Sequence, residues 1–101
     1  MKRKCEVRLL PQAQEDFLEI IEFIAEDKPS AAEKMTDRFE NAFKLLSENP
    51  MAGRATRENR LRLLQYRVLV TEPYLIFYQI KKNTVFIFRI LHGARDYLQI
   101  L

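Results

Sequence analysis

Two stretches in the second half of the chain decide the fold: Tyr74-Leu75-Ile76-Phe77-Tyr78-Gln79-Ile80 and Thr84-Val85-Phe86-Ile87-Phe88-Arg89-Ile90-Leu91. Both are rich in aromatic and β-branched residues, and Lys81-Lys82-Asn83 between them has the composition of a turn. A third strand is predicted over Leu61 to Thr71, where apolar residues alternate with polar ones up to the break at Glu72-Pro73. We therefore expect an antiparallel meander of three strands.

These strands are apolar on both faces. A sheet with one face on helices and the other in water alternates apolar and polar residues, but in the last strand only Thr84 and Arg89 interrupt the apolar run. A pair of helices covers one face, so the sequence predicts a second apolar face without internal cover, which normally marks a protein-binding site. A sheet curled tightly enough to bury its own concave side is the alternative for part of this surface.

Two amphipathic helices are predicted upstream of the strands. Pro11 suits the first position of a helix, and Ser30-Ala31-Ala32-Glu33 matches a capping box directly after Pro29, so a second helix begins there and ends at Asn49-Pro50. The first helix carries a run of carboxylates that we interpret as a solvated face: Glu15, Asp16, Glu19, Glu22, Glu26 and Asp27. The short connection makes the two helices an antiparallel hairpin.

The expected fold is α+β. Residues 5–10 alternate with period two and predict a short N-terminal strand that can join the sheet, and residues 51–60 read as an exposed loop. The helical hairpin packs on an antiparallel sheet of about four strands. A short C-terminal helix can follow from Arg95. Residues 1–101 form a single domain in this interpretation.

The composition excludes several protein classes. With 101 residues, 48% hydrophobic and 31% charged, the chain suits one compact domain and is not a disordered protein. Cys5 and His92 are its single cysteine and histidine, so we expect no internal disulfide, no Cys/His zinc site, no other metal and no cofactor. No signal peptide and no apolar run of about 20 residues is present, which indicates a cytoplasmic protein without a membrane partner.

Charge is distributed unevenly. Residues 1–50 hold eight Lys and Arg against eleven Asp and Glu, whereas residues 51–101 hold nine against three. Arginine forks suit phosphate and carboxylate, so the second half predicts a binding surface for an acidic partner. For Arg54, Arg57 and Arg60 a solvated basic loop is an equal alternative. Arg89 lies within an apolar strand and should be paired or functional.

The C-terminal segment gathers groups that could cleave RNA. Arg89, His92, Arg95, Asp96 and Tyr97 lie within nine residues, and together they could activate a 2′-hydroxyl, neutralise a phosphorane and protonate a leaving oxygen. A lone histidine at a strand end is more often structural, however, and Arg95-Asp96 can be a simple ion pair.

The chain resembles the RelE/ParE superfamily of bacterial type II toxins over nearly its whole length. The resemblance rests on the Asn49-Pro50-x-x-Gly53 loop, the strand from Tyr74 to Tyr78, and the segment Arg89-Ile90-Leu91-His92-Gly93-Ala94-Arg95-Asp96. It implies a growth-inhibiting toxin in a hetero-oligomeric complex with an antitoxin, whose apolar and acidic C-terminal segment would fold onto the second sheet face.

The resemblance implies two cellular targets. RelE-like members are ribosome-dependent, metal-independent ribonucleases that cut mRNA, whereas ParE-like members poison DNA gyrase without that catalytic set. Leu75 stands where the RelE pattern has an arginine, although Arg95 aligns with a catalytic arginine and His92 lies near a catalytic histidine of some relatives. Loss of a phosphate-neutralising group costs about two to three orders of magnitude in rate, so the ParE-like assignment is favoured. A third possibility is an inert toxin that keeps only antitoxin binding.

Two sets of candidate site residues follow. No catalytic residue is assigned in the ParE-like case; in the ribonuclease case the candidates are Arg89, His92, Arg95 and Tyr97. The candidates for binding the antitoxin or the target are Arg60, Arg62, Arg67, Leu75, Phe77 and Arg89.

Overall fold

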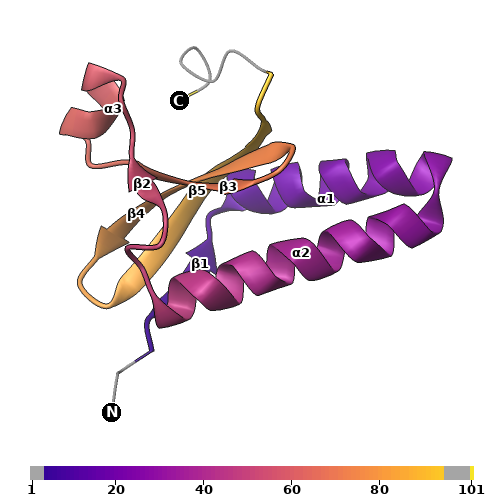
Figure 1. Ribbon diagram of the computed structural model, residues 1–101, viewed down its shortest axis with the longest axis horizontal. Coiled ribbons are helices and arrows are strands. Elements are labelled where there is room, and N and C mark those ends of the chain that lie inside the picture. Colours follow the sequence, from indigo (N-terminus) through magenta and orange to yellow (C-terminus); the bar gives the residue numbers. More distant parts are fainter. Residues whose placement is uncertain (1–3, 95–100) are drawn as a thin grey trace.

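A computed structural model describes residues 4–94 and residue 101 of the chain. Figure 1 shows a helical hairpin that packs against a twisted sheet, with a short third helix away from the hairpin, so the expected α+β fold is confirmed. The elements in chain order are β1 (Glu6–Leu9), α1 (Pro11–Asp27), α2 (Pro29–Glu48), β2 (Arg54–Ala55), α3 (Asn59–Leu63), β3 (Arg67–Thr71), β4 (Tyr74–Lys81) and β5 (Thr84–His92).

The helical hairpin forms as predicted, except at the start of α2. Pro11 occupies the first turn of α1, but α2 begins at Pro29 rather than at a capping box, and no side chain caps its first turn. The physical reason is that Pro29 is itself suited to the first helical position, with Lys28 as the residue before it. Ser30 consequently lies inside the helix, and Lys28 alone connects α1 to α2.

The sheet is mixed and has five strands in the order β1-β5-β4-β3-β2. The meander of β3, β4 and β5 is antiparallel as expected. The N-terminal strand does join the sheet, but it pairs with β5 in the parallel direction. The hairpin of helices carries the chain away from β1, and the chain returns through β2, which adds a short fifth strand beside β3.

The predicted loop at residues 51–60 and the predicted start of the third strand are corrected by the structure. Arg54 and Ala55 form β2, residues from Asn59 to Leu63 form α3, and β3 begins only at Arg67. The alternation before Arg67 therefore belongs to a helix and a turn. Glu58 stabilises α3, because its carboxylate accepts a hydrogen bond of 2.8 Å from the backbone N–H of Leu61.

The main core lies between the hairpin and the inner face of the sheet. Phe39 is completely buried and lies 5.5 Å from the ring of Phe17 and 5.6 Å from that of Tyr74. Aliphatic side chains from α2 and the central strands complete this cluster, including Leu46, Ile76 and Ile87. This packing holds the strands that carry the candidate site residues.

The outer face of the sheet is partly covered, which corrects the expectation of an apolar face without internal cover. Val68, Phe77 and Leu91 form a second buried cluster, and Tyr66 and Leu101 pack against it. The turn after α3 is attached to the same face, since Gln79 on β4 donates a hydrogen bond of 2.6 Å to the carbonyl of Leu64. The rest of the outer face of the sheet is not covered by these residues.

Within the described part of the chain, no helix combines the length and the apolar character that a membrane span requires.

Candidate functional site

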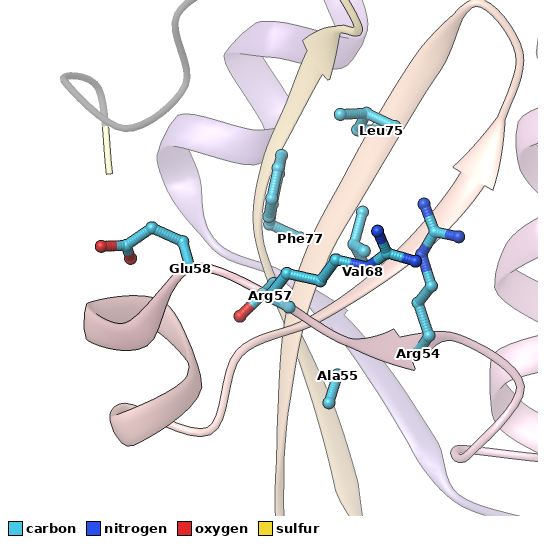
Figure 2. Close-up of a pocket in the computed structure, with 8 residues that line it drawn as sticks. Arg54, Ala55, Arg57, Glu58, Val68, Leu75 and Phe77 are labelled. Carbon is cyan, nitrogen blue, oxygen red and sulfur yellow. The ribbon is translucent and has the colours of Figure 1, made fainter.

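A small hollow on the outer face of the sheet joins apolar and basic side chains. Its volume is about 130 Å³. Figure 2 shows Val68, Leu75 and Phe77 on the sheet, with the side chains of Arg54 and Arg57 extending over Val68. We call this site the arginine hollow; it is lined by Arg54, Ala55, Thr56, Arg57, Glu58, Val68, Leu75 and Phe77.

The arginine hollow carries positive charge that its own acid does not neutralise. Glu58 points away from the two arginines in Figure 2, because its carboxylate caps α3. Among the described residues neither Arg54 nor Arg57 forms an ion pair. Thr56 is 8% exposed, and its hydroxyl has no hydrogen-bond partner within residues 4–94 and 101. An apolar floor with two guanidinium groups at its rim suits a carboxylate or phosphate on an apolar stem.

The predicted binding residues divide between the surface and the interior. Arg60 and Arg62 lie exposed on α3, where Arg62 Nη2 donates a hydrogen bond of 2.9 Å to Asn59 Oδ1. Leu75 is half-buried in the arginine hollow, whereas Phe77 is 1% exposed and forms part of its floor. The structure thus brings Leu75 and Phe77 together beneath Arg54 and Arg57, two arginines for which a solvated loop was an equal alternative in the sequence.

Arg67 supports the loop before β2. Its Nη2 donates a hydrogen bond of 2.6 Å to the carbonyl of Gly53. The same loop is held by Tyr78, whose hydroxyl donates to the carbonyl of Pro50 at 2.7 Å and accepts from the N–H of Gly53 at 2.9 Å. A Cβ at position 53 would lie 2.6 Å from that hydroxyl and 2.7 Å from the Val68 carbonyl, so only glycine fits. The Asn49-Pro50-x-x-Gly53 loop, one of the motifs that resemble the toxin superfamily, therefore positions the arginine hollow.

Arg89 is paired; the sequence had predicted that it would be either paired or functional. Its Nε and Nη2 donate hydrogen bonds of 2.7 and 2.9 Å to the two carboxylate oxygens of Asp16. The hydrogen bond to Asp16 raises the pKa of the Arg89 guanidinium, which therefore stays charged. Asp16 also accepts from the backbone N–H of Ile90 at 3.0 Å, where β5 extends beyond its pairing with β1.

Asp16 was missed by the sequence analysis, which assigned it to a solvated face. It is buried instead, because its position on α1 is three residues from Ala13 and four from Ile20, both of which contact the main core. That spacing, together with an arginine inside an apolar strand, was a signal that could have identified the pair.

His92 and Arg89 lie on opposite faces of the sheet. Arg89 is paired across the strands with Phe77 of the outer face, whereas His92 is paired with Tyr74, whose ring belongs to the main core. His92 is exposed, its ring lies edge-on to Tyr74 at 5.6 Å, and its Nδ1 accepts a hydrogen bond of 3.0 Å from the N–H of Ala94. The structure does not bring these two ribonuclease candidates together.

Arg95, Tyr97 and the expected helix from Arg95 onward lie outside the described residues. Among the residues that are described, no group of three His, Cys, Asp or Glu side chains is arranged to hold a metal ion.

The chain is similar to known protein sequences over most of its length. Residues 7–97 match the family described as the ParE toxin of the type II toxin–antitoxin system parDE. The Y4kP protein of Sinorhizobium fredii is 34% identical over 101 residues, which cover the whole of both chains. Toxin RelE2 of Caulobacter vibrioides is 33% identical over 84 residues, which cover 83% of this chain and 90% of that protein.

Solved structures share the fold. The chromosomal ParDE system of P. aeruginosa matches with a TM-score of 0.71 and 21% identity, over 90% of this chain and 98% of that chain. The toxin–antitoxin complex RelBE2 of Mycobacterium tuberculosis matches with a TM-score of 0.67 and 23% identity, over 94% and 98%. With the family match over residues 7–97, these findings show that the chain belongs to the ParE toxin family within the RelE/ParE superfamily of type II toxins.

Proposed function

We propose that this toxin arrests growth by binding DNA gyrase in the cytoplasm and that it performs no catalysis of its own. The proposal is supported by the match to the ParE toxin family over residues 7–97. It is supported further by Leu75, which stands on the outer face where the RelE pattern requires an arginine.

The observation that carries the proposal is the Asp16–Arg89 pair. A guanidinium that neutralises a phosphorane must direct its donors at the phosphate. Arg89 instead directs two of its donors at Asp16, and its side chain is only 18% exposed. Because His92 lies on the other face, the described residues do not assemble an acid, a base and a free arginine at one point of the surface.

Gyrase supercoiling by the purified chain tests this function. We expect inhibition of supercoiling and accumulation of cleaved DNA, whereas relaxation by topoisomerase I, as a specificity control, should be unchanged. The double variant His92→Ala with Arg95→Ala should inhibit gyrase as well as the parent chain does, because binding needs no catalytic set. Normal supercoiling in the presence of excess toxin would contradict the proposal.

We also propose that a cognate antitoxin neutralises the toxin by binding the outer face. Two solved structures with the same fold are a ParDE system and a RelBE2 toxin–antitoxin complex. The basic residues of the arginine hollow and the exposed side chains of Leu63 and Val70 suit a segment with acidic and apolar residues. Co-expression with the polypeptide of the adjoining reading frame should restore growth and yield a stable complex.

A second candidate function is ribosome-dependent cleavage of mRNA. It is favoured by the 33% identity to a protein named toxin RelE2 and by Arg95, which aligns with a catalytic arginine of the RelE pattern. In that case programmed ribosomes should yield codon-registered mRNA cuts that vanish in the His92→Ala, Arg95→Ala variant. Full toxicity of this double variant in cells would exclude the ribonuclease.

A further inference from the structure

The far end of the helical hairpin carries an aromatic side chain that is largely uncovered. Phe23 on α1 is 74% exposed. Figure 1 shows that this end of the hairpin extends beyond the strands of the sheet. A single exposed apolar residue is common on protein surfaces, so the significance of Phe23 depends on what surrounds it and on whether a matching surface exists.

Acidic residues surround Phe23 on the helix. Residues three and four positions apart are neighbours on a helix surface, so Glu26 and Asp27 lie beside Phe23 on α1, and both are exposed. Among residues 4–94 and 101, neither of them forms an ion pair. The end of the hairpin therefore presents an aromatic ring next to two carboxylates that have no cationic partner in the described structure.

The arginine hollow has the complementary chemistry. Val68, Leu75 and Phe77 form its apolar floor. Arg54 and Arg57 extend over this floor in Figure 2, and neither of them is paired with an acid of the described residues. Cavities of about 150 Å³ lined by apolar side chains accept a benzene molecule, so a hollow of about 130 Å³ at the surface has room for a phenyl ring.

The wall of the hollow also holds a polar group without a partner. Thr56 lines the hollow and is 8% exposed, and its hydroxyl makes no hydrogen bond within the described part of the chain. A buried hydroxyl without a partner is destabilising unless a further group satisfies it. A carboxylate that another molecule brings to the rim would supply an acceptor at this wall.

The end of the hairpin and the hollow lie too far apart to meet within one chain. Figure 1 shows the connection between α1 and α2 on one side of the molecule and β2 with α3 on the opposite side. In addition, α1 packs against the inner face of the sheet, whereas the hollow lies on the outer face. The two surfaces can therefore meet only between different copies of the chain.

We propose that copies of the chain associate head to tail, with Phe23 of one copy in the arginine hollow of the next. The carboxylates of Glu26 and Asp27 then lie at the two arginines of that hollow. A second copy is the occupant that the charges favour, because residues 1–50 hold eight Lys and Arg against eleven Asp and Glu, whereas residues 51–101 hold nine against three. Each copy thus carries both halves of the contact.

An interface between two different surfaces leaves one hollow and one Phe23 free at the ends of every open oligomer. Heterologous contacts of this kind continue into chains or close into rings, whereas a symmetric contact stops at a dimer. Because the arginine hollow belongs to the surface proposed for the antitoxin, self-association and antitoxin binding would exclude each other. This consequence rests on the proposed function, but the association itself does not.

Sedimentation velocity of the purified full chain tests the association. We expect the average mass to rise continuously between about 10 and 300 µM, the range in which contacts with Kd values of that order form. High salt should reduce the mass, because it screens exposed charges. A chain that stays monomeric over this range would overturn the proposal, and so would a dimer that grows no further.

The aromatic contact is tested by substitution of Phe23. Phe23→Ser should weaken the association by roughly tenfold or more, because a central aromatic anchor carries a large share of the binding energy of an interface. Leu18→Ser is the matched control, since Leu18 is 57% exposed on the same helix but at a spacing that places it on a different side of α1. Equal effects of the two substitutions would show that the association uses another surface.

A mixture of two variants provides the sharpest test. Phe23→Ser keeps the hollow intact, and the double variant Arg54→Glu, Arg57→Glu keeps Phe23. Each variant alone should remain monomeric where the parent chain associates, whereas the equimolar mixture should form a one-to-one pair that does not grow, because a single competent contact remains. A mixture that stays monomeric, or that grows beyond a pair, would overturn the proposal. Circular dichroism checks the fold of both variants, which change only exposed side chains.

Charge reversal at the hairpin end tests the ionic contact. Glu26→Arg with Asp27→Arg should weaken the association by about tenfold. A chain that also carries Arg54→Glu and Arg57→Glu should associate again, because the attraction is restored with the signs exchanged. No recovery in this chain would show that the carboxylates and the arginines do not meet. All of these measurements use the toxin alone, so their failure would leave the proposed binding to gyrase unaffected.

Discussion

The two faces of the sheet are built from the same apolar strands but are covered differently. On the inner face, the hairpin of α1 and α2 buries Ile76, Tyr78 and Ile87 completely. On the outer face, Phe77 and Leu91 are buried in a smaller cluster against which Tyr66 and Leu101 pack, but Val70 stays exposed beside Arg54. The extent of the cover, rather than the apolar character of the strands, thus decides which face stabilises the fold and which is available for binding.

Truncation of one side chain on each side of the sheet should show this difference most strongly. Phe39→Ala removes a completely buried ring and should lower the free energy of unfolding by about 3–5 kcal/mol. Val70→Ala should change it by less than about 0.5 kcal/mol, because the side chain already contacts water. Urea denaturation measures both. A similar loss in the two variants would show that the outer face contributes to stability as the inner face does.

The next largest effect should come from the pair that links α1 to β5. Asp16→Ala leaves the Arg89 guanidinium and the N–H of Ile90 without their acceptor. Since the Arg89 side chain keeps 18% exposure, we expect a loss of about 2–3 kcal/mol, below the range for a fully buried pair. The control is Glu22→Ala on the exposed side of α1. Thermal and urea unfolding measure this loss. If the free energy of unfolding of Asp16→Ala equals that of the parent chain, the pair is dispensable for stability.

The loop that positions the arginine hollow provides a smaller effect and a test of coupling. Gly53→Ala should cost about 1–3 kcal/mol, because its Cβ would collide with the Tyr78 hydroxyl and the Val68 carbonyl. In a Tyr78→Phe background one of these collisions is removed, so the added cost of Gly53→Ala should be smaller. A double-mutant cycle in urea measures this coupling. Strictly additive effects would indicate that the loop moves away from Tyr78 without cost.

The sequence predicted the elements with strong periodicity. Both helices of the hairpin and the two long strands were recognisable because apolar residues recur along ten or more residues or fill a whole strand. The segment from Arg54 to Leu63 was not, since β2 has two residues and α3 has five, too few for a period to appear. The parallel pairing of β1 was also hidden, because alternation reveals a strand but not the direction of its neighbour.

Prediction of the candidate site was limited by contacts between distant segments. Arg89 was correctly expected to be paired or functional, but its partner lies 73 residues away on a helix whose other carboxylates are exposed. Arg67 was expected at a binding surface, which stays a prediction, and its guanidinium supports Gly53, 14 residues earlier. In both cases the type of residue was informative, whereas the choice between binding and support depended on tertiary packing that no local pattern encodes.

The smallest predicted effect compares one tyrosine from each face. Burial raises the pKa of Tyr66, which packs on the outer face, and of Tyr74 in the main core. In the unfolded chain both ionise near their ordinary pKa of about 10, so above this pH the folded state holds more protons. Stability should therefore be unaffected below about pH 10 and should fall as the pH rises further, by at most about 1.4 kcal/mol per pH unit for each tyrosine. Tyr66→Phe and Tyr74→Phe should each reduce this slope in urea titrations. An unchanged slope in Tyr66→Phe alone would mean that the cover of the outer face admits water to the phenol, and that the second cluster is looser than the first.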